Sequence, residues 1–364
     1  MEKNVLIKVR PIKKGEQPLI RRMLNRSFPF LTRLFVTFRG RDILVAEGNG
    51  KPLGGVILKS FYLPRRGKGG LVEWIFTAPE ARGCGAGQKL LDAALKHFKQ
   101  KKIAEVFAII EGNNTDSINI FVSREFHILS PGQQLKRYGL NILPVWINTF
   151  HYMDVGHFLY VRPAEPQKDA PALQWWSGLL VSALIALLAM WRLNNFAQLD
   201  RRALTAVPLC FALVLGGREI TMRLAAWLQG LKVRFRVWES GFFLNTLLAV
   251  FFGWFFPVPG SVYPRETGWK YREHAEKLGW VALAGSFFLL PAAWAVPVYR
   301  LLGNEPGYNL DIFAYIALFT AFFDLVLPFF PFSGYNGRRL WNWHPLIWLI
   351  PAVAVVVLFF VIGS

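Results

Sequence analysis

The chain of 364 residues has room for two domains of ordinary size, and 53% of its residues are hydrophobic. Its two cysteines exclude a disulfide framework, and its net charge of +19 is unevenly distributed. Residues 1–170 carry 27 Lys and Arg against 14 Asp and Glu, whereas the remaining residues carry 15 against 9, mostly between long apolar runs. The sequence therefore predicts a basic soluble domain followed by a membrane domain.

The positive charge of the first part restricts the class of partner. Anionic lipid headgroups or an anionic cofactor are the simplest partners of a basic domain tethered to a bilayer. Nucleic acid is the other class, but no nucleic-acid-binding motif accompanies the charge. Part of the excess also follows the positive-inside rule. A lipid bilayer is therefore expected as a partner, and nucleic acid is not.

Residues 1–165 alternate strand-like and helix-like stretches. Ile43–Glu47 and Gly54–Lys59 are strand-like and flank the turn Gly48-Asn49-Gly50, which predicts a β-hairpin. Later patterns predict strands at Leu71–Phe76, Val106–Ile110 and His157–Val161, a helix at Gln88–Phe98, and a short helix ending at Ser123. Strands interleaved with helices indicate an α/β domain.

A glycine-rich loop, Arg82-Gly83-Cys84-Gly85-Ala86-Gly87, joins the strand at Leu71–Phe76 to the helix at Gln88–Phe98. Backbone N–H groups in such a loop can converge on a pyrophosphate, and the helix N-terminus adds a positive dipole end. Glycine is needed because a Cβ would hold the phosphate oxygens away from the backbone. A Rossmann nucleotide loop is disfavoured, because the loop follows several antiparallel-type strands instead of opening a βαβ unit.

Residues 5–162 resemble the GNAT acetyltransferase family. Arg82, Gly85 and Gly87 match its Q/R-x-x-G-x-G/A signature, and the stretch from Asn113 to Phe126 resembles its second cofactor-contacting segment. The resemblance implies a mixed central sheet flanked by helices, and acetyl-CoA (or another acyl-CoA) as co-substrate. It implies that the cofactor contacts are Ile75, Phe76 and Thr77 in the strand, Arg82, Gly83, Cys84, Gly85, Ala86, Gly87 and Gln88 in the loop, and Asn113, Asn114 and Ser117 after the next strand.

Direct transfer of an acyl group to an amine needs a base, and an acid for the leaving thiolate assists it. Glu73 lies in the strand before the loop, where family members often place a carboxylate base, and its apolar neighbours would desolvate it. A structural edge carboxylate is the alternative for Glu73, and Glu111 is the second candidate base. The family's usual acid, a Tyr, is replaced by Phe121, so Tyr138 is the remaining candidate acid.

Beyond a linker at 166–174, residues 175–364 are predicted to form an all-α polytopic membrane domain with five or six spanning segments. The apolar segments lie at 175–191, 203–229, 241–257, 279–299, 311–331 and 345–362. The third is short, and if it does not cross, the basic loops 230–278 and 332–344 share one side. With no signal peptide visible, this arrangement predicts a multi-pass protein whose GNAT domain is cytosolic.

The membrane half resembles a degenerate site-2 protease. Arg218 and Met222 stand where the histidines of that family's His-Glu-x-x-His helix belong, and Asn336 replaces its ligand aspartate. Because zinc needs three protein ligands, and the only histidines beyond residue 170 are His274 and His344 in predicted loops, no metal is expected. Arg218, Glu219, Arg223 and Asp324 are predicted to form an internal polar cluster, either as a structural Arg218–Asp324 salt bridge or as a polar pocket.

These features predict a membrane-anchored N-acyltransferase that acts on an amine acceptor and is not an active metallopeptidase. The alternative is a catalytically weak acyl-CoA sensor that controls binding by a protease-like membrane domain without peptidase activity.

Overall fold

A computed structural model of the protein describes residues 6–152, 155–165, 170–329 and 331–363 and divides the chain into two compact units. The first unit comprises Met1–Ile110, Asp116–His151 and Phe158–Gln167. The second comprises Lys168–Ser364 and two short segments from the first half of the chain, Glu111–Thr115 and Tyr152–His157. A single boundary near residue 165 was expected, so the two short segments are a finding of the structure. Residues 166–169 of the expected linker lie outside the described residues.

The core of the first unit is a seven-stranded mixed sheet with the strand order β1-β2-β3-β4-β5-β7-β6. Its strands are β1 (Ile7–Pro11), β2 (Asp42–Gly48), β3 (Lys51–Leu63), β4 (Gly67–Thr77), β5 (Glu105–Glu111), β6 (His127–Ile128) and β7 (His157–Arg162). Strands β1 to β4 pair antiparallel, whereas β4 and β5 pair parallel. The helices and 3-10 turns are α1 (Gln17–Ser27), α2 (Phe30–Arg33), η1 (Pro79–Ala81), α3 (Ala86–Gln100), α4 (Thr115–Val122), α5 (Pro131–Tyr138), η2 (Gly139–Asn141) and α6 (Ile142–Thr149).

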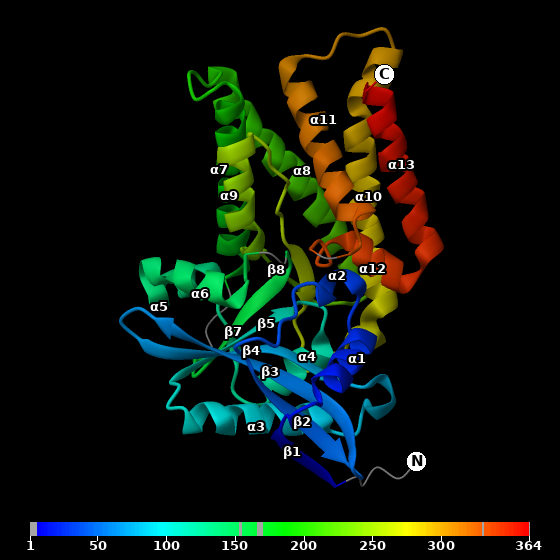
Figure 1. Ribbon diagram of the computed structural model, residues 1–364. Coiled ribbons are helices and arrows are strands. Elements are labelled where there is room, and N and C mark those ends of the chain that lie inside the picture. The colour runs from blue at the N-terminus through cyan, green and yellow to red at the C-terminus, as the bar shows by residue number, and fades with distance from the viewer. Residues whose placement is uncertain (1–5, 153–154, 166–169, 330, 364) are drawn as a thin grey trace. The chain divides into compact units, whose positions relative to one another are not determined.

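Two layers of helices cover this sheet. Helix α3 lies along one face, and α1, α5 and α6 lie on the other (Figure 1). A Cβ on Gly70 of β4 would meet the ring of Phe98 in α3, whereas the neighbouring Gly69 faces Phe61 and Phe107. These contacts put α3 close against β4, immediately after the glycine-rich loop. The predicted α/β fold with a mixed sheet is confirmed.

The hairpin between β2 and β3 is confirmed, with Asn49 (φ 50°) and Gly50 (φ 74°) in the left-handed conformation that a tight turn between twisted strands requires. The sequence patterns missed β1 and α1. Strand β1 alternates basic and apolar residues at the edge of the sheet, where an exposed face weakens the hydrophobic signal.

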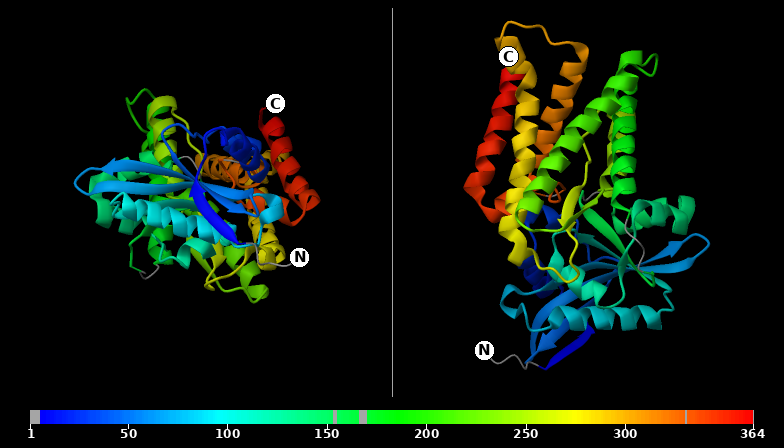
Figure 2. Two further views of the ribbon diagram at one scale, coloured as in Figure 1. Left: turned by 60° about the horizontal axis from the view of Figure 1, so that its bottom comes forward. Right: turned by 180° about the vertical axis from the view of Figure 1, so that it is seen from behind.

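The second unit is mainly helical. Its elements are α7 (Pro171–Leu193), α8 (Arg201–Leu228), β8 (Val233–Arg236), α9 (Ser240–Phe252), β9 (Ser261–Pro264), α10 (Tyr271–Leu301), α11 (Tyr308–Ala321), the π-helical turn η3 (Phe322–Val326), α12 (Asn336–Trp343) and α13 (Pro345–Gly363). Helix α10 packs against α8 and α11, and α7 packs against α9 (Figure 2). A buried cluster of small and aliphatic side chains, among them Ala186, Val214, Leu289 and Ala317, fills the space between these helices.

Four helices are long and apolar enough to cross a membrane: Pro171–Leu193, Arg201–Leu228, Tyr271–Leu301 and Tyr308–Val326. The third predicted segment is a 13-residue helix, α9, which at 1.5 Å per residue spans about 20 Å and is too short to cross. The expected loop 230–278 contains the two-stranded sheet β8–β9, and His274 lies in the first turn of α10, not in a loop. Helix α10 begins earlier than predicted because its first two turns are polar, so the hydropathy pattern does not include them.

The packing of α8 on α10 depends on a glycine. A Cβ on Gly217 would lie 2.1–2.5 Å from atoms of the Phe288 ring, whereas a Cβ on Gly216 would make an ordinary 3.7 Å contact with Trp175. We expect Gly217→Ala to lower the free energy of unfolding by about 1–3 kcal/mol, because the ring must move out of a packed site. Gly216→Ala, the matched control, should be neutral or slightly stabilising. Thermal unfolding in detergent would test this, and equal melting temperatures for the two variants would contradict it.

Candidate active site

The glycine-rich loop lies between the end of β4 and the start of α3. Gly83 (φ 83°) and Gly85 (φ 85°) are both left-handed, and a Cβ built on either would meet no protein atom within 4 Å. The N-cap residue Gly85 supplies no side chain to cap α3, and the first turn of α3 contains no acidic residue. The first N–H groups of α3 are therefore left for an external acceptor, as an anion-binding helix N-terminus requires.

The loop and the first turn of α3 carry two basic side chains. Arg82 and Lys89 are exposed, and Cys84 is half-buried. The third loop glycine, Gly87, lies against Ile120 of α4, which a built Cβ would approach to 3.5 Å. Positive charge, unpaired helix amides and left-handed glycines together fit a pyrophosphate such as that of CoA.

Strands β4 and β5 diverge at their C-terminal ends, where β4 leads into the loop. Their parallel pairing runs from Gly69↔Glu105 to Val72↔Ala108 and stops there, although β4 continues to Thr77 and β5 to Glu111. A bulge at Glu73 coincides with the divergence, because Leu58 of β3 pairs with Val72 while Ile57 pairs with Trp74. Bulges bend a strand and re-aim its side chains, which is common next to active sites.

The predicted strand contacts lie beyond this divergence. Ile75, Phe76 and Thr77 pair with β3 on one side and have lost β5 on the other, so their remaining backbone groups can meet an extended ligand. The ring of Phe76 itself is in the core and packs edge-on against Phe28, the residue that follows α1. The backbone of Phe76, and not its side chain, is therefore available for contact with an extended ligand.

Glu73, the candidate base, is almost fully buried and held in a bidentate ion pair. Arg41 donates from Nε to Oε2 at 2.5 Å and from Nη2 to Oε1 at 3.0 Å. The surroundings of Glu73, which were predicted to be apolar, therefore include the cation of Arg41. The sequence pattern did not predict this contact, because Arg41 lies 32 residues away, just before β2. Close by, burial and then the charge of Arg41 lower the pKa of Lys59, whose Nζ donates to the carbonyl of Asn148 at 2.7 Å.

Tyr138 is not placed with the other candidates. It is buried at the end of α5 against Phe107, the guanidinium groups of Arg66 and Arg137 lie 5.1 and 5.7 Å from its ring centroid, and burial raises the pKa of its hydroxyl. Arg137 also pairs with Glu105, at the opposite end of β5 from Glu111. The structure therefore does not bring Tyr138 to Glu73 or to the loop, and Tyr138 belongs to the core of the first unit.

Glu111 and Asn113, two further candidates, belong to the second unit. Glu111 ends β5 and is partly buried. Asn113 is buried, and its Oδ1 accepts a hydrogen bond from Arg339 at 3.1 Å. Asn114, the next residue, is exposed, and Ser117 in α4 is partly exposed. Nothing in the sequence pattern links Asn113 to an arginine 226 residues away.

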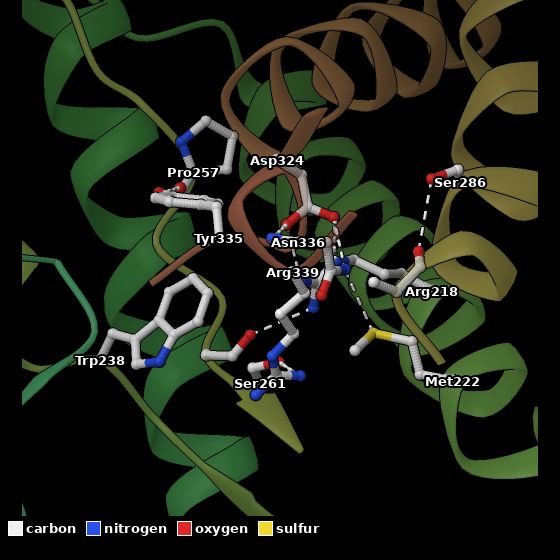
Figure 3. A network of polar contacts seen from close by, with 12 residues as sticks. Arg218, Met222, Trp238, Pro257, Ser261, Ser286, Asp324, Tyr335, Asn336 and Arg339 are labelled. Atoms are coloured by element: carbon white, nitrogen blue, oxygen red, sulfur yellow. Dashed lines mark hydrogen bonds and ion pairs between the residues drawn. The ribbon is translucent and has the colours of Figure 1, made fainter. Parts of the chain in front are cut away.

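The second unit contains a buried polar network, which Figure 3 shows from close by. Arg218 of α8 forms two hydrogen bonds with Asp324 of η3, at 2.8 and 2.9 Å, and donates to the carbonyl of Gly260. Asp324 also accepts from the Nδ2 of Asn336 at 2.8 Å, and that Nδ2 lies 3.5 Å from the sulfur of Met222. The predicted Arg218–Asp324 salt bridge is confirmed, and Glu219 pairs separately with Arg223.

Of the three positions that were compared with zinc ligands, Arg218 and Asn336 bind Asp324, and Met222 lies against Asn336 (Figure 3). None of them is a residue type that binds zinc as His, Cys or carboxylate does. Among the residues that the structure describes, no group of three or more His, Cys, Asp or Glu could hold a metal ion.

Comparisons with known proteins identify the first part of the chain. Residues 18–126 match the model of the Acetyltransferase (GNAT) family. Solved structures similar to the chain include a GNAT family acetyltransferase from Elizabethkingia anophelis with acetyl-CoA bound, at 15% identity over 43% of this chain and 96% of that one, with a TM-score of 0.32. The ribosomal-protein-S18-alanine N-acetyltransferase from Escherichia coli is 12% identical over 45% and 97%, with a TM-score of 0.33. No curated protein matches the chain.

Proposed function

Given a GNAT acetyltransferase domain at residues 18–126, we propose that the protein transfers an acetyl group from acetyl-CoA to an amine acceptor. The observation that carries the proposal is the loop from Arg82 to Gly87. It presents left-handed glycines and the uncapped N-terminus of α3 beside the divergence of β4 and β5. An anionic pyrophosphate fits the loop, and an extended thioester arm fits the backbone of residues 75–77.

In this reaction an amine nitrogen forms a bond to the acetyl carbon, the carbon–sulfur bond breaks, and the thiolate takes up a proton. Glu73 is the residue proposed to accept the proton of the attacking ammonium, directly or through a water molecule. Its carboxylate can accept further hydrogen bonds beside those from Arg41, because each oxygen carries two lone pairs. Arg41 orients Glu73, and the bulge at Glu73 re-aims its side chain relative to the rest of β4.

The second unit is proposed to anchor the protein in a lipid bilayer as a multi-pass domain with the acetyltransferase domain on the cytosolic side. The lengths and hydropathy of α7, α8, α10 and the helix formed by α11 and η3 support insertion. The juxtaposition of Arg218, Met222 and Asn336 supports a degenerate relative of the site-2 proteases. With these residue types in place of ligands, the unit would lack peptidase activity.

The alternative is a sensor that binds acyl-CoA with little turnover. Two observations favour it over an efficient enzyme. Phe121 stands where the resemblance implies a tyrosine that acts as the acid. It is buried and packs edge-on against Phe126 with ring centroids 5.0 Å apart. Glu73 is already engaged by Arg41. Both functions require acyl-CoA binding, and only the enzyme requires Glu73 for turnover.

Calorimetry with acetyl-CoA and the full-length protein in detergent tests the shared requirement. We expect wild type to bind, and Gly85→Ala to bind about tenfold more weakly, because alanine disfavours φ 85° and its Cβ points to where the phosphates would lie. Gly50→Ala is the matched control: Gly50 is also left-handed with no atom near its Cβ, but it lies in the β2–β3 turn. Absence of binding by folded wild type would overturn the proposal, as would equal affinities for the two variants.

A further inference from the structure

The two faces of the sheet in the first unit are covered by helices that differ in the character of their outer surfaces. Helix α3 lies on one face, and its exposed residues are all polar or charged: Gln88, Lys89, Asp92, Lys96, Lys99 and Gln100. Helices α1, α2, α5 and α6 lie on the other face (Figure 1), and large apolar side chains are exposed along them. Because soluble domains rarely expose large apolar patches, this second face is a candidate interaction surface.

Helix α6, with the turn η2 before it, is apolar toward the core and also toward its outer side. Ile142 and Val145 pack into the core of the first unit. Leu140, Leu143 and Ile147, which we call the α6 patch, follow one another at intervals of three and four residues and are exposed, Leu140 by 86% and Ile147 by 52%. A surface helix is normally polar on its outer side, so an apolar outer side indicates contact with an apolar environment.

A second exposed apolar patch lies at α2. Phe30, Leu31 and Leu34, which we call the α2 patch, occupy this short helix and the residue after it, and Phe30 and Leu34 are exposed by 68% and 65%. None of the three belongs to the core cluster that α1 forms with the sheet. Their exposed area therefore does not serve the packing of the first unit, which points to a partner that covers it.

This face is positively charged as well as apolar. Residues 17–41, which include α1 and α2, contain six arginines and no acidic residue, and residues 129–152, which include α5 and α6, contain two basic residues and no acidic one. Arg22 and Arg39 are exposed. A second copy of the chain docked through the same face would bring like charges together. An anionic bilayer instead offers negative headgroups to the arginines and hydrocarbon to the apolar side chains.

We infer that the face of the first unit formed by α1, α2, α5 and α6 rests on an anionic lipid bilayer, with the α2 patch and the α6 patch inserted between the headgroups. The inference goes beyond the proposed function, because it gives the acetyltransferase domain a membrane contact of its own. It rests on the proposed anchoring in one respect. Residues 163–170 connect β7 to α7, so a bilayer that holds α7 keeps the first unit at a high effective concentration beside it.

Photo-crosslinking of the full-length protein in nanodiscs of phosphatidylcholine and phosphatidylglycerol tests the inference. The photoreactive residue p-benzoylphenylalanine replaces one residue at a time, at Phe30, Ile147, Lys96 or Phe287, and lipid adducts are measured by mass spectrometry. Phe30 and Ile147 should give about tenfold more lipid adduct than Lys96 on the opposite face of the sheet, because only inserted side chains reach the acyl chains. Phe287, exposed on α10, reports whether the second unit is in the bilayer.

The contribution of charge is tested with paired variants. Arg22→Glu combined with Arg39→Glu should lower the lipid adduct at Phe30 several-fold, as should nanodiscs of phosphatidylcholine alone, because both remove the attraction to anionic headgroups. Lys96→Glu combined with Lys99→Glu is the matched control, since it changes the net charge by the same amount on α3 and should leave the adduct unchanged. All four positions are exposed, so folding should be unaffected.

The position at Phe287 separates failure of the inference from failure of the anchoring. Lipid adducts at Phe287, with a level at Phe30 or at Ile147 that does not exceed the level at Lys96, would overturn the inference alone. Crosslinks from Phe30 to a second copy, or to another part of the same chain, in place of lipid would do the same. Absence of lipid adducts at Phe287 as well would overturn the proposed anchoring, and the inference with it.

Discussion

Asp324→Ala is expected to lower the free energy of unfolding by about 3–5 kcal/mol, because it leaves Arg218 buried and charged without its partner. Both side chains are almost completely buried, and Asp324 accepts two hydrogen bonds from Arg218 and two from Asn336. Removal of the carboxylate therefore leaves several donors without an acceptor. Thermal unfolding in a mild detergent is the measurement, with the melting temperature as the readout.

Asp311→Ala provides the control, since Asp311 lies in α11, the helix that continues directly into η3. Asp311 is half-exposed and 3.9 Å from Arg300, so its loss should cost less than about 1 kcal/mol. Arg218→Met combined with Asp324→Leu should recover much of the stability lost in Asp324→Ala, because no unpaired charge remains buried. If Asp324→Ala were no more destabilising than Asp311→Ala, the prediction that the buried ion pair stabilises the helical unit would be wrong.

Glu73→Gln is expected to lower kcat by about 10²–10⁴-fold while acetyl-CoA affinity stays within about twofold of wild type. A glutamine keeps the size and one acceptor oxygen of Glu73 but cannot take a proton from an ammonium. Turnover would be followed by release of free thiol with the best acceptor from a panel that contains a small amine, an amino sugar, a lipid-linked amine and peptides with free N-termini.

Two variants control for the loss of the ion pair and for the second candidate base. Glu47→Gln breaks a comparable pair on strand β2 of the same sheet, where Arg10 donates at 2.6 Å, and should leave kcat unchanged. A large loss in Glu111→Gln with none in Glu73→Gln would assign the base to Glu111 instead. Acetyl-CoA binding without turnover in wild type, over the whole panel, would favour the sensor.

The predictable part of the fold is the part that depends on local sequence. The Asn49-Gly50 turn, the alternation along β3 and the helical spacing of α3 gave correct elements because each is stabilised by interactions close in the chain. Strand β1 and the sheet β8–β9 were missed, since their stability comes from a partner strand and not from their own pattern. Helix α12 was expected as a loop because its Asn, Gly and Arg residues give no helical hydrophobic pattern, and the helix is stabilised by packing against other elements.

The candidate site was predictable in part for the same reason. The loop from Arg82 to Gly87 is one contiguous motif, so its glycines and the helix after it could be placed from sequence. Glu73 could be located on its strand, but the bulge there and the ion pair with Arg41 arise from β3 and from a distant turn. Tyr138 was nominated for its hydroxyl alone, and burial against Phe107 removes it from the site.

By itself, the sequence determined the GNAT domain, the apolar helices and the complementary residues Arg218 and Asp324, because composition, periodicity and a motif are properties of the chain. Only the tertiary structure decided that Asp324 also binds Asn336, that Arg339 holds Asn113, and that Glu111–Thr115 packs within the helical unit. The physical reason is that a buried charged group must form hydrogen bonds or ion pairs with the residues that pack around it, and those residues can be hundreds of positions away in the sequence. Here 226 residues separate the arginine from the asparagine that it holds.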